Sequence, residues 1–277
     1  MRKIHLAALA AALMLFMFHP AIALPVASNV AGGIALVPLG TVLDSPDRPS
    51  AWLGDRPVWV AAEDGHWIAV VGVPLDTRAG RQTLRVRTNG AERTTPFEIR
   101  EKHYAEQRIT LKDSSKVTLS PEDEARALAE IERIQALKKH WRPSTETGTD
   151  FGKPVAGRLA SRFGLRRIFN GEPRAPHSGL DIAARRGTPV GAPAAAIVLA
   201  VDDYFFNGKT VFLDHGNGLL SMYCHLDRID VKPGETLRKG QTLGRIGATG
   251  RASGPHLHWS VVLNGTMVDP ELFLKRR

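Results

Sequence analysis

The short stretch SGPHLHWSV, residues 253–261, places two histidines one residue apart. Side chains of a strand alternate between its two faces, so His256 and His258 are expected to share a face while Leu257 points to the other. Two imidazoles on one face suit a metal site. An HxH pair alone is weak evidence for one, so the hypothesis needs further ligands elsewhere in the chain.

A second pair with metal-binding chemistry lies upstream in HSGLD, where His177 and Asp181 are four residues apart. The Ser-Gly between them favours a loop that leads into a strand. Zinc binds both imidazole nitrogen and carboxylate oxygen, and catalytic zinc sites combine three protein ligands with an open position for water. His177, Asp181 and one histidine of the HxH pair would supply those three ligands. Taken alone, the HxxxD pair is more simply an ordinary surface pair.

The third candidate is the histidine of LLSMYCHL, residues 219–226. If this stretch is a regular strand, one face is apolar and belongs in the core; it carries Leu220, Met222, Cys224 and Leu226. The opposite face is expected to open into a cleft, and it carries Ser221, Tyr223 and His225. Cys224 is then a small buried hydrophobe. His225 either acts in the cleft or is a surface histidine of a strand.

Together, HSGLD, YCHL and TGRASGPHLHW resemble the signature blocks of the lysostaphin-type, or LytM-domain, zinc metallopeptidases, which cut peptide bonds in peptidoglycan. The resemblance covers roughly residues 154–273. It implies one zinc ion, held by His177, Asp181 and His258, and a catalytic pair formed by His225 and His256. The whole mature chain resembles the exported two-domain envelope members of Gram-negative bacteria.

The mechanism that the resemblance implies uses a zinc-activated water whose pKa falls toward about 7. One imidazole of the catalytic pair accepts a proton, and an imidazolium stabilises the oxyanion or protonates the leaving amine. The sequence does not assign these two roles between His225 and His256. The implied substrates are stem-peptide cross-links, such as D-alanyl–diaminopimelate bonds.

The chain departs from the family pattern in two places. Ser260 and Val261 follow the HxH aromatic residue, where relatives often carry a glutamate. The loop before His177 lacks the tyrosine that some relatives use as an oxyanion helper. This loop contains instead a set of arginines, which either bind stem-peptide carboxylates or form a solvated basic loop: Arg162, Arg166, Arg167 and Arg174. His215, in DHGNG, is interpreted as a structural turn residue.

The rest of the chain predicts a mostly β fold. Short apolar runs broken by turns at Asp64-Gly65 and Asn89-Gly90 favour a small N-terminal β-sandwich over residues 24–100. Residues 101–152 are expected to be a linker, and residues 153–277 a LytM-type antiparallel β-domain. The Pro-Gly and Lys-Gly punctuation in VKPGETLRKGQTLGRIG is typical of such a compact β-domain.

The linker is expected to contain a helix over about residues 120–141. Ser120 can cap it, and Pro121 suits the first helical position. An apolar stripe at helical spacing is predicted to pack on a domain, and it consists of Leu128, Ile131, Ile134, Leu137 and Trp141. A further hypothesis is that this helix or a neighbouring segment blocks the cleft, so that deletion of residues 24–145 would raise activity.

The N-terminus has the layout of a secretory signal peptide over residues 1–23, with a basic start, an apolar run and the small-residue ending Ala21-Ile22-Ala23. Cleavage near Ala23 would release a periplasmic protein without a stable membrane span; an uncleaved anchor is the alternative. The formal net charge is +9 and the single cysteine excludes an internal disulfide. Because no nucleic-acid-binding motif accompanies the charge, peptidoglycan is the expected anionic partner.

Two other functions compete with the enzyme. A non-enzymatic LytM-type regulator would activate cell-wall amidases, but such proteins typically have lost metal ligands, and all are present here. A biotinyl or lipoyl carrier domain would explain the stretch GTPVGAP…VKPGETLRKG, but no lysine lies in the hairpin that such carriers modify. Other cell-wall enzymes or envelope proteins are further candidate partners.

Overall fold

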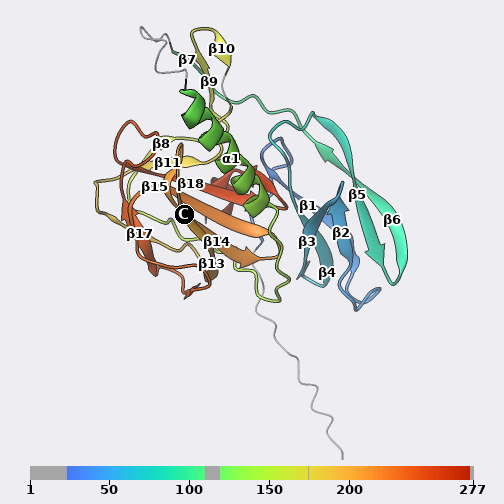
Figure 1. Ribbon diagram of the computed structural model, residues 1–277. Coiled ribbons are helices and arrows are strands. Elements are labelled where there is room, and N and C mark those ends of the chain that lie inside the picture. Colours follow the sequence, from blue (N-terminus) through green and yellow to red (C-terminus); the bar gives the residue numbers. More distant parts are fainter. Residues whose placement is uncertain (1–23, 110–118, 174, 275–277) are drawn as a thin grey trace, which may run out of the picture.

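A computed structural model describes residues 24–109, 119–173 and 175–274 (Figure 1). Within these ranges the chain is mostly β with one α-helix, which confirms the predicted fold class. The predicted signal peptide, residues 1–23, lies outside the described residues. No helix in the described part of the chain is long and apolar enough to cross a bilayer.

The N-terminal domain is a six-stranded antiparallel sheet with the strand order β1-β4-β3-β2-β5-β6. Its strands are β1 (Ile34–Thr41), β2 (Ser50–Leu53), β3 (Arg56–Glu63), β4 (His66–Gly72), β5 (Gly80–Thr88) and β6 (Ala91–Ile99). The sheet curls until β1 approaches β6, so that it nearly closes around a core of valines and aromatic residues. Both predicted turns join hairpins, and Asp64 and Asn89 have the positive φ that such turns require.

The linker helix α1 spans Pro121–Lys138. As predicted, Ser120 caps it, because its side chain accepts a hydrogen bond from the backbone N–H of Asp123 at 3.1 Å. The apolar stripe is only half correct, since Leu128 and Ile131 are 58% and 43% exposed.

The face of α1 that meets the C-terminal domain is instead set by a mixture of apolar and polar side chains. Ile134 and Leu137 pack on buried Met222 and Cys224 of the C-terminal domain. Glu130, on the same side, is buried and forms hydrogen bonds. The helix is therefore rotated away from the orientation that its apolar residues alone predict.

The C-terminal domain is built on a large antiparallel sheet whose main path is β16-β13-β14-β15-β18-β11-β8. The strands of this path are β8 (Arg158–Ser161), β11 (Leu180–Ala183), β13 (Ala196–Tyr204), β14 (Gly208–Gly216), β15 (Leu219–Ile229), β16 (Thr236–Leu237) and β18 (His256–Leu263). Three further strands join its edges: β12 (Pro189–Gly191), β17 (Thr242–Ile246) and β19 (Thr266–Val268). A short 3-10 helix, Pro270–Phe273, follows.

A separate three-stranded sheet connects the linker to the C-terminal domain. Its strands are β7 (Glu106–Ile109), β9 (Arg166–Phe169) and β10 (Glu172–Pro173), in the order β10-β9-β7. β7 belongs to the linker and pairs in parallel with β9, which lies in the arginine-rich loop before His177. The linker thus contributes a strand close to the first candidate metal ligand.

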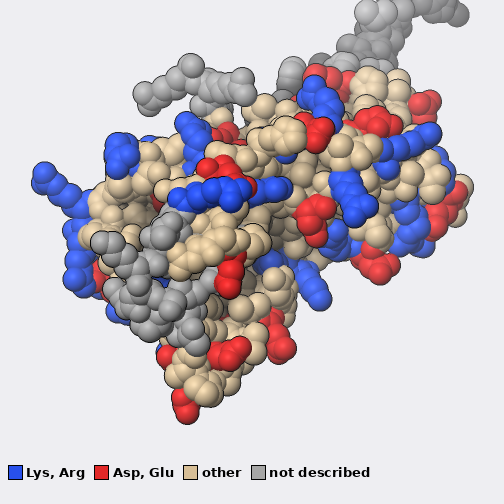
Figure 2. Space-filling view, turned by 90° about the horizontal axis from the view of Figure 1, so that it is seen from above, with Lys and Arg blue, Asp and Glu red and all other residues tan. Residues whose placement is uncertain are grey.

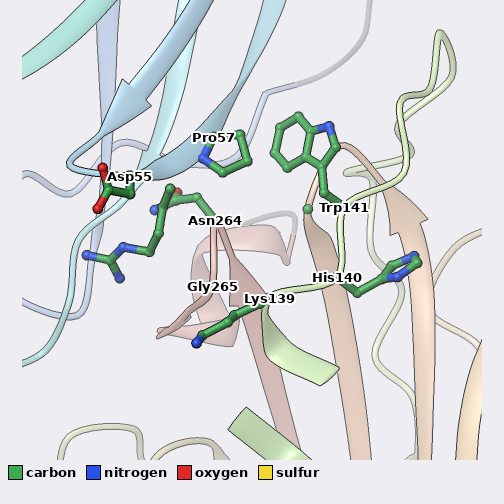
Figure 3. Close-up of a pocket in the computed structure, with 9 residues that line it drawn as sticks. Asp55, Pro57, Lys139, His140, Trp141, Asn264 and Gly265 are labelled. Carbon is green, nitrogen blue, oxygen red and sulfur yellow. The ribbon is translucent and has the colours of Figure 1, made fainter. Parts of the chain in front are cut away.

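The two β-domains are joined by direct hydrogen bonds. The side chain of Asn264 accepts one from the Gly72 N–H at 2.6 Å and donates another to the Gly72 carbonyl at 3.1 Å. Beside this contact lies a cavity of about 330 Å³ (Figure 3). Pro57 of the N-terminal domain and Trp141, which follows α1, both line it. Trp141 also lies close to the Gly218 backbone, where a Cβ atom would come within 2.7 Å of the indole.

Candidate metal centre and catalytic histidines

The strand pairing of the C-terminal domain explains how residues distant in sequence meet. β11 pairs with β18 in a register that places Asp181 opposite His258. β15 pairs with the other edge of β18, and the last residue pair is Cys224 opposite His258. His225, the next residue of β15, therefore lies close to the level of His258. His177, just before β11, is held by backbone hydrogen bonds to Gly164 and Leu165. The structure therefore brings all five predicted site residues together.

Three side-chain atoms form a compact triangle. The His177 Nε2, Asp181 Oδ1 and His258 Nδ1 atoms each lie 3.0 Å from the other two. Among the described residues, these three form a group whose ligand atoms could hold a metal ion. Zinc ligands lie at about 2.0–2.2 Å from the ion, and one ion can reach all three corners of a triangle of this size.

The outer nitrogens of the two ligand histidines show that the inner ones are oriented for a cation. Nδ1 of His177 lies 2.8 Å from the carbonyl of Arg162, which can only accept, so in the neutral form of the ring the lone pair of Nε2 faces inward. Nε2 of His258 is hydrogen-bonded to Ser260 Oγ at 2.9 Å. Partners of this kind fix the ring orientation of metal-ligating histidines. The donor set therefore fits a zinc ion.

Ionisation also favours a cation at this position. Burial alone would raise the pKa of Asp181, but the influence of the adjacent His177 and His258 rings outweighs it and holds this pKa well below its usual range. Burial lowers the pKa of His258, despite its hydrogen bond to Asp181. At neutral pH the centre therefore presents a carboxylate together with neutral imidazole.

The two remaining histidines stand next to this triangle. The ring centroids of His225 and His256 are 4.8 Å apart, and Nε2 of His256 lies 3.8 Å from Asp181 Oδ1. Nδ1 of His225 donates to the carbonyl of Thr249 at 2.9 Å, and Nδ1 of His256 to that of Gly254 at 2.8 Å. In the neutral form of either ring, Nε2 is then left to accept a proton.

Burial lowers the pKa of His225 to about 4, more than its hydrogen bond to Thr249 can compensate. The ring is therefore neutral at pH 7. Because Nδ1 of this neutral ring is bound to a backbone carbonyl, Nε2 is free to accept a proton beside the His177, Asp181 and His258 cluster. Thr249 and Ser260 have orienting roles that the sequence reasoning missed. Ser260 was detectable, because it lies two residues after His258 on the same face of a strand.

The predicted polar face of β15 is wrong for two of its three members. Ser221 and Tyr223 are fully buried and do not line a cleft. They join His215 in a chain of hydrogen bonds, in which Ser221 Oγ lies 2.8 Å from both His215 Nε2 and the Tyr223 hydroxyl. His215 is thus a buried structural residue, as interpreted from the sequence.

Ser221 and Tyr223 keep the predicted alternation with Met222 and Cys224, but both faces of β15 are buried there, and the strand breaks only after them. His225 has a φ of +62°, in the left-handed region, and the register of β15 shifts around it. The alternation of faces is therefore reset: Leu226 packs in the same core as Tyr223, whereas Met222 and Cys224 pack in a separate cluster under α1. Burial raises the pKa of the Cys224 thiol to about 12, in agreement with its predicted inert role.

The arginines before His177 have different environments. Nη1 of Arg162 binds Glu271 at 2.6 Å, so this side chain is paired within the protein. Arg167 reaches Ser161 Oγ at 3.4 Å, and the same oxygen lies 3.3 Å from His177 Nδ1. Arg174 lies outside the described residues. On the face drawn in Figure 2, Lys and Arg side chains are interspersed with Asp and Glu, without one continuous basic patch.

Comparison with known proteins agrees with this fold and site. The model of peptidase family M23 matches residues 175–270, and that of the peptidase family M23 N-terminal domain matches residues 27–102. A crystal structure of a putative peptidase M23 from Pseudomonas aeruginosa is 42% identical and has a TM-score of 0.75, with 89% of this chain and 95% of that chain covered. The chain belongs to peptidase family M23, which confirms the family resemblance.

Curated relatives match part of the chain. The peptidoglycan DD-endopeptidase ShyC of Vibrio cholerae is 40% identical over 115 residues, which are 41% of this chain and 26% of that protein. The DD-carboxypeptidase/endopeptidase Mpg of Neisseria meningitidis is 36% identical over 116 residues, which are 42% of this chain and 27% of that protein. The chain thus spans about a quarter of the length of these relatives.

Proposed function

We propose that this protein is an exported, zinc-dependent endopeptidase that hydrolyses the stem-peptide cross-links of peptidoglycan. The observation that carries the proposal is the triangle of His177, Asp181 and His258 donor atoms, with the neutral His225 and the His256 ring directly beside it. The relatives named as peptidoglycan DD-endopeptidases support the choice of substrate.

The residues divide the chemistry between them. His177, Asp181 and His258 would hold the zinc ion, which when bound supplies an activated water and polarises the scissile carbonyl. Nε2 of His225 or of His256 accepts the proton that the attacking water loses. The ring that receives it then donates that proton to the leaving amine, and the other ring stabilises the developing oxyanion when its Nε2 carries a proton. The backbone carbonyls of Thr249 and Gly254 keep both rings aligned for these transfers.

We further propose that the protein acts in the periplasm. The signal-peptide layout of residues 1–23 supports export, and peptidoglycan is found outside the cytoplasmic membrane. A fusion of residues 1–30 to a reporter that is active only after export tests this step. In a control fusion, Arg2 and Lys3 are kept and charged residues interrupt the apolar run. Reporter activity that persists in this control would argue against export by a signal peptide.

The reaction itself is tested on a purified muropeptide dimer joined by a single D-alanyl–diaminopimelate bond. The proposal predicts two monomers whose masses correspond to hydrolysis of that bond, identified by mass spectrometry. If the zinc-loaded protein leaves this cross-link intact and cuts another peptide bond of the same substrate, the proposed cleavage site is wrong. An intact dimer together with stimulation of a cell-wall amidase would favour the regulator instead.

A further inference from the structure

A buried carboxylate on the linker helix has no role in the metal centre. Glu130 is only 5% exposed, although most of α1 faces solvent. Glutamate is almost never buried unless it is paired. One carboxylate oxygen of Glu130 accepts the backbone N–H of Phe205 at 2.6 Å, and the other accepts Nε of Arg126 at 2.7 Å. Arg126 in turn donates to the carbonyl of Asp203 at 3.1 Å.

Phe205 belongs to the turn that joins β13 to β14, residues 204–208, here called the 204–208 turn, and Asp203 directly precedes this turn. Tyr204, at its start, packs in the cluster that Ile134 and Leu137 of α1 complete. Arg133 of α1 adds an ion pair with Asp202 at 3.7 Å. The helix therefore contacts this turn and the end of β13 through a buried hydrogen bond, apolar packing and charged contacts along one face.

The far side of the same turn holds His225. The carbonyl of Asn207 accepts the backbone N–H of His225 at 2.8 Å. Thr249, whose carbonyl orients the His225 ring, accepts the N–H of Lys209 through its side chain at 3.0 Å. Gly208 lies so close to Thr249 that a Cβ atom there would come within 2.3 Å of its hydroxyl. Both the backbone and the ring of His225 thus rest on the 204–208 turn.

His225 depends on such support because of its backbone conformation. Its φ of +62° lies in the left-handed region, which is unfavourable for residues other than glycine. Strained conformations of this kind persist only where the surroundings over-determine them. The bond to Asn207 supplies that constraint, since the register shift in β15 removes His225 from the regular ladder.

From these contacts we infer that α1 is a positioning element of the catalytic site and that Glu130 is its positioning residue. Glu130 fixes the 204–208 turn through Phe205, and the turn fixes His225 through Asn207 and Thr249. The inference rests on the proposed function in that His225 is taken as a member of the catalytic pair. Because α1 packs behind β15, on Met222 and Cys224, its removal lowers activity and does not unblock a cleft.

α1 connects the junction of the two β-domains with the 204–208 turn. The helix lies between the two β-domains (Figure 1), and Trp141, just beyond its C-terminal end, sits against Gly218 at the cavity of the domain junction (Figure 3). A change at this junction that shifts α1 is therefore transmitted to His225.

The test uses the full mature chain with zinc and compares Glu130→Ala, Glu130→Gln and Glu132→Ala. Glu132 is an exposed neighbour on the same helix and serves as the control. Glu130→Ala is expected to lower kcat about tenfold with unchanged KM and zinc content, a part of the ~10²–10⁴-fold that a positioned acid–base group contributes. Glu130→Gln retains an oxygen that can accept the Phe205 N–H, so it is expected to recover most of kcat.

A second readout follows the structure without relying on catalysis. Amide hydrogen exchange measured by NMR is expected to accelerate at least tenfold at Phe205 and His225 in Glu130→Ala, while the His177 amide keeps its protection. Unchanged exchange at His225, or equal acceleration at His177, would overturn the inference. If Glu130→Ala does not fold, Arg126→Ala is used instead, because it removes only the residue that orients the carboxylate. Hydrogen exchange at the same three amides then tests the inference.

The two readouts also separate this inference from the proposed function. If the wild-type protein cleaves no peptidoglycan substrate, the proposed function fails, whatever the exchange data show. If the wild type is active and Glu130→Ala is equally active, the positioning role fails and the proposed function stands.

Discussion

Nε2 of His177 lies 3.0 Å from Nδ1 of His258, and each ring binds a separate partner through its other nitrogen. Two neutral imidazoles cannot share this geometry through a hydrogen bond if both inner nitrogens carry lone pairs. A cation between them, also bound by Asp181, resolves the conflict. The arrangement therefore has the chemistry of a metal centre that is assembled by the fold.

The first prediction is that substitution of a ligand abolishes metal binding. Asp181→Asn removes the charged corner of the triangle, so zinc measured by mass spectrometry after dialysis is expected to fall from one ion per chain to nearly none. His103→Ala, at a histidine whose side chain is 88% exposed, is the control and keeps its zinc. Full zinc occupancy in Asp181→Asn would contradict the assignment of this ligand.

The second prediction separates catalysis from metal binding. His225 is not part of the donor triangle, so His225→Ala is expected to retain its zinc. Its turnover should nevertheless fall by about 10²–10⁴-fold, the contribution of a positioned acid–base group. Zinc content and the rate of muropeptide cleavage are measured on the same preparation. Wild-type turnover, or the loss of zinc, would show that His225 does not have the proposed role.

The site was predictable from sequence where its strands are regular. β18 follows the expected alternation, so His256 and His258 share a face and Leu257 is buried in the core. On β15, Ser221 and Tyr223 also follow the alternation, but the face that they share is buried and not open to a cleft. The positive φ of His225 resets the alternation only for the residues that follow. Nothing in the residue pattern signals a left-handed histidine inside a strand; the constraint comes from tertiary contacts with Asn207 and Thr249.

The linker helix shows the same limit at the level of packing. Its start was predictable, because capping depends on the local residues Ser120 and Pro121. Its buried face was not, because the apolar stripe suggested that Leu128 and Ile131 pack on a domain. In the structure, the contacts of Glu130 with the 204–208 turn fix the rotation of the helix, and those contacts are long-range in sequence.

The third prediction concerns stability at acidic pH. Burial lowers the pKa of His215 to about 4, from 6.5 in an unfolded chain. The unfolded state therefore binds more protons between these values, so stability is complete above pH 6.5 and declines as the pH falls toward 4. This one residue should account for about 3 kcal/mol of the decline.

Chemical denaturation between pH 4 and 7 measures this effect. The variant His215→Gln lacks the titrating ring, so it should be less stable than wild type at pH 7, and the gap should narrow as the pH is lowered. Parallel stability curves for the two proteins over this range would show that His215 does not titrate as its burial implies.

The fourth prediction concerns the domain junction. Asn264→Ala removes both side-chain hydrogen bonds to Gly72 and leaves buried backbone groups unpaired. The free energy of unfolding should fall by about 2 kcal/mol. Asp64→Ala, at an exposed turn whose φ of +47° is also positive, controls for backbone strain. An equal loss of stability in both variants would assign the effect to the backbone and not to the junction.

The central claim is that the histidine and aspartate cluster makes this protein a metal-dependent peptidoglycan endopeptidase. Its most direct test is digestion of purified peptidoglycan sacculi by the mature protein, with and without a chelator, beside His258→Ala. We expect uncrosslinked muropeptides from the wild type, none with chelator, recovery when zinc is restored, and none from the variant. Release of the same muropeptides by chelated protein or by His258→Ala would contradict the claim.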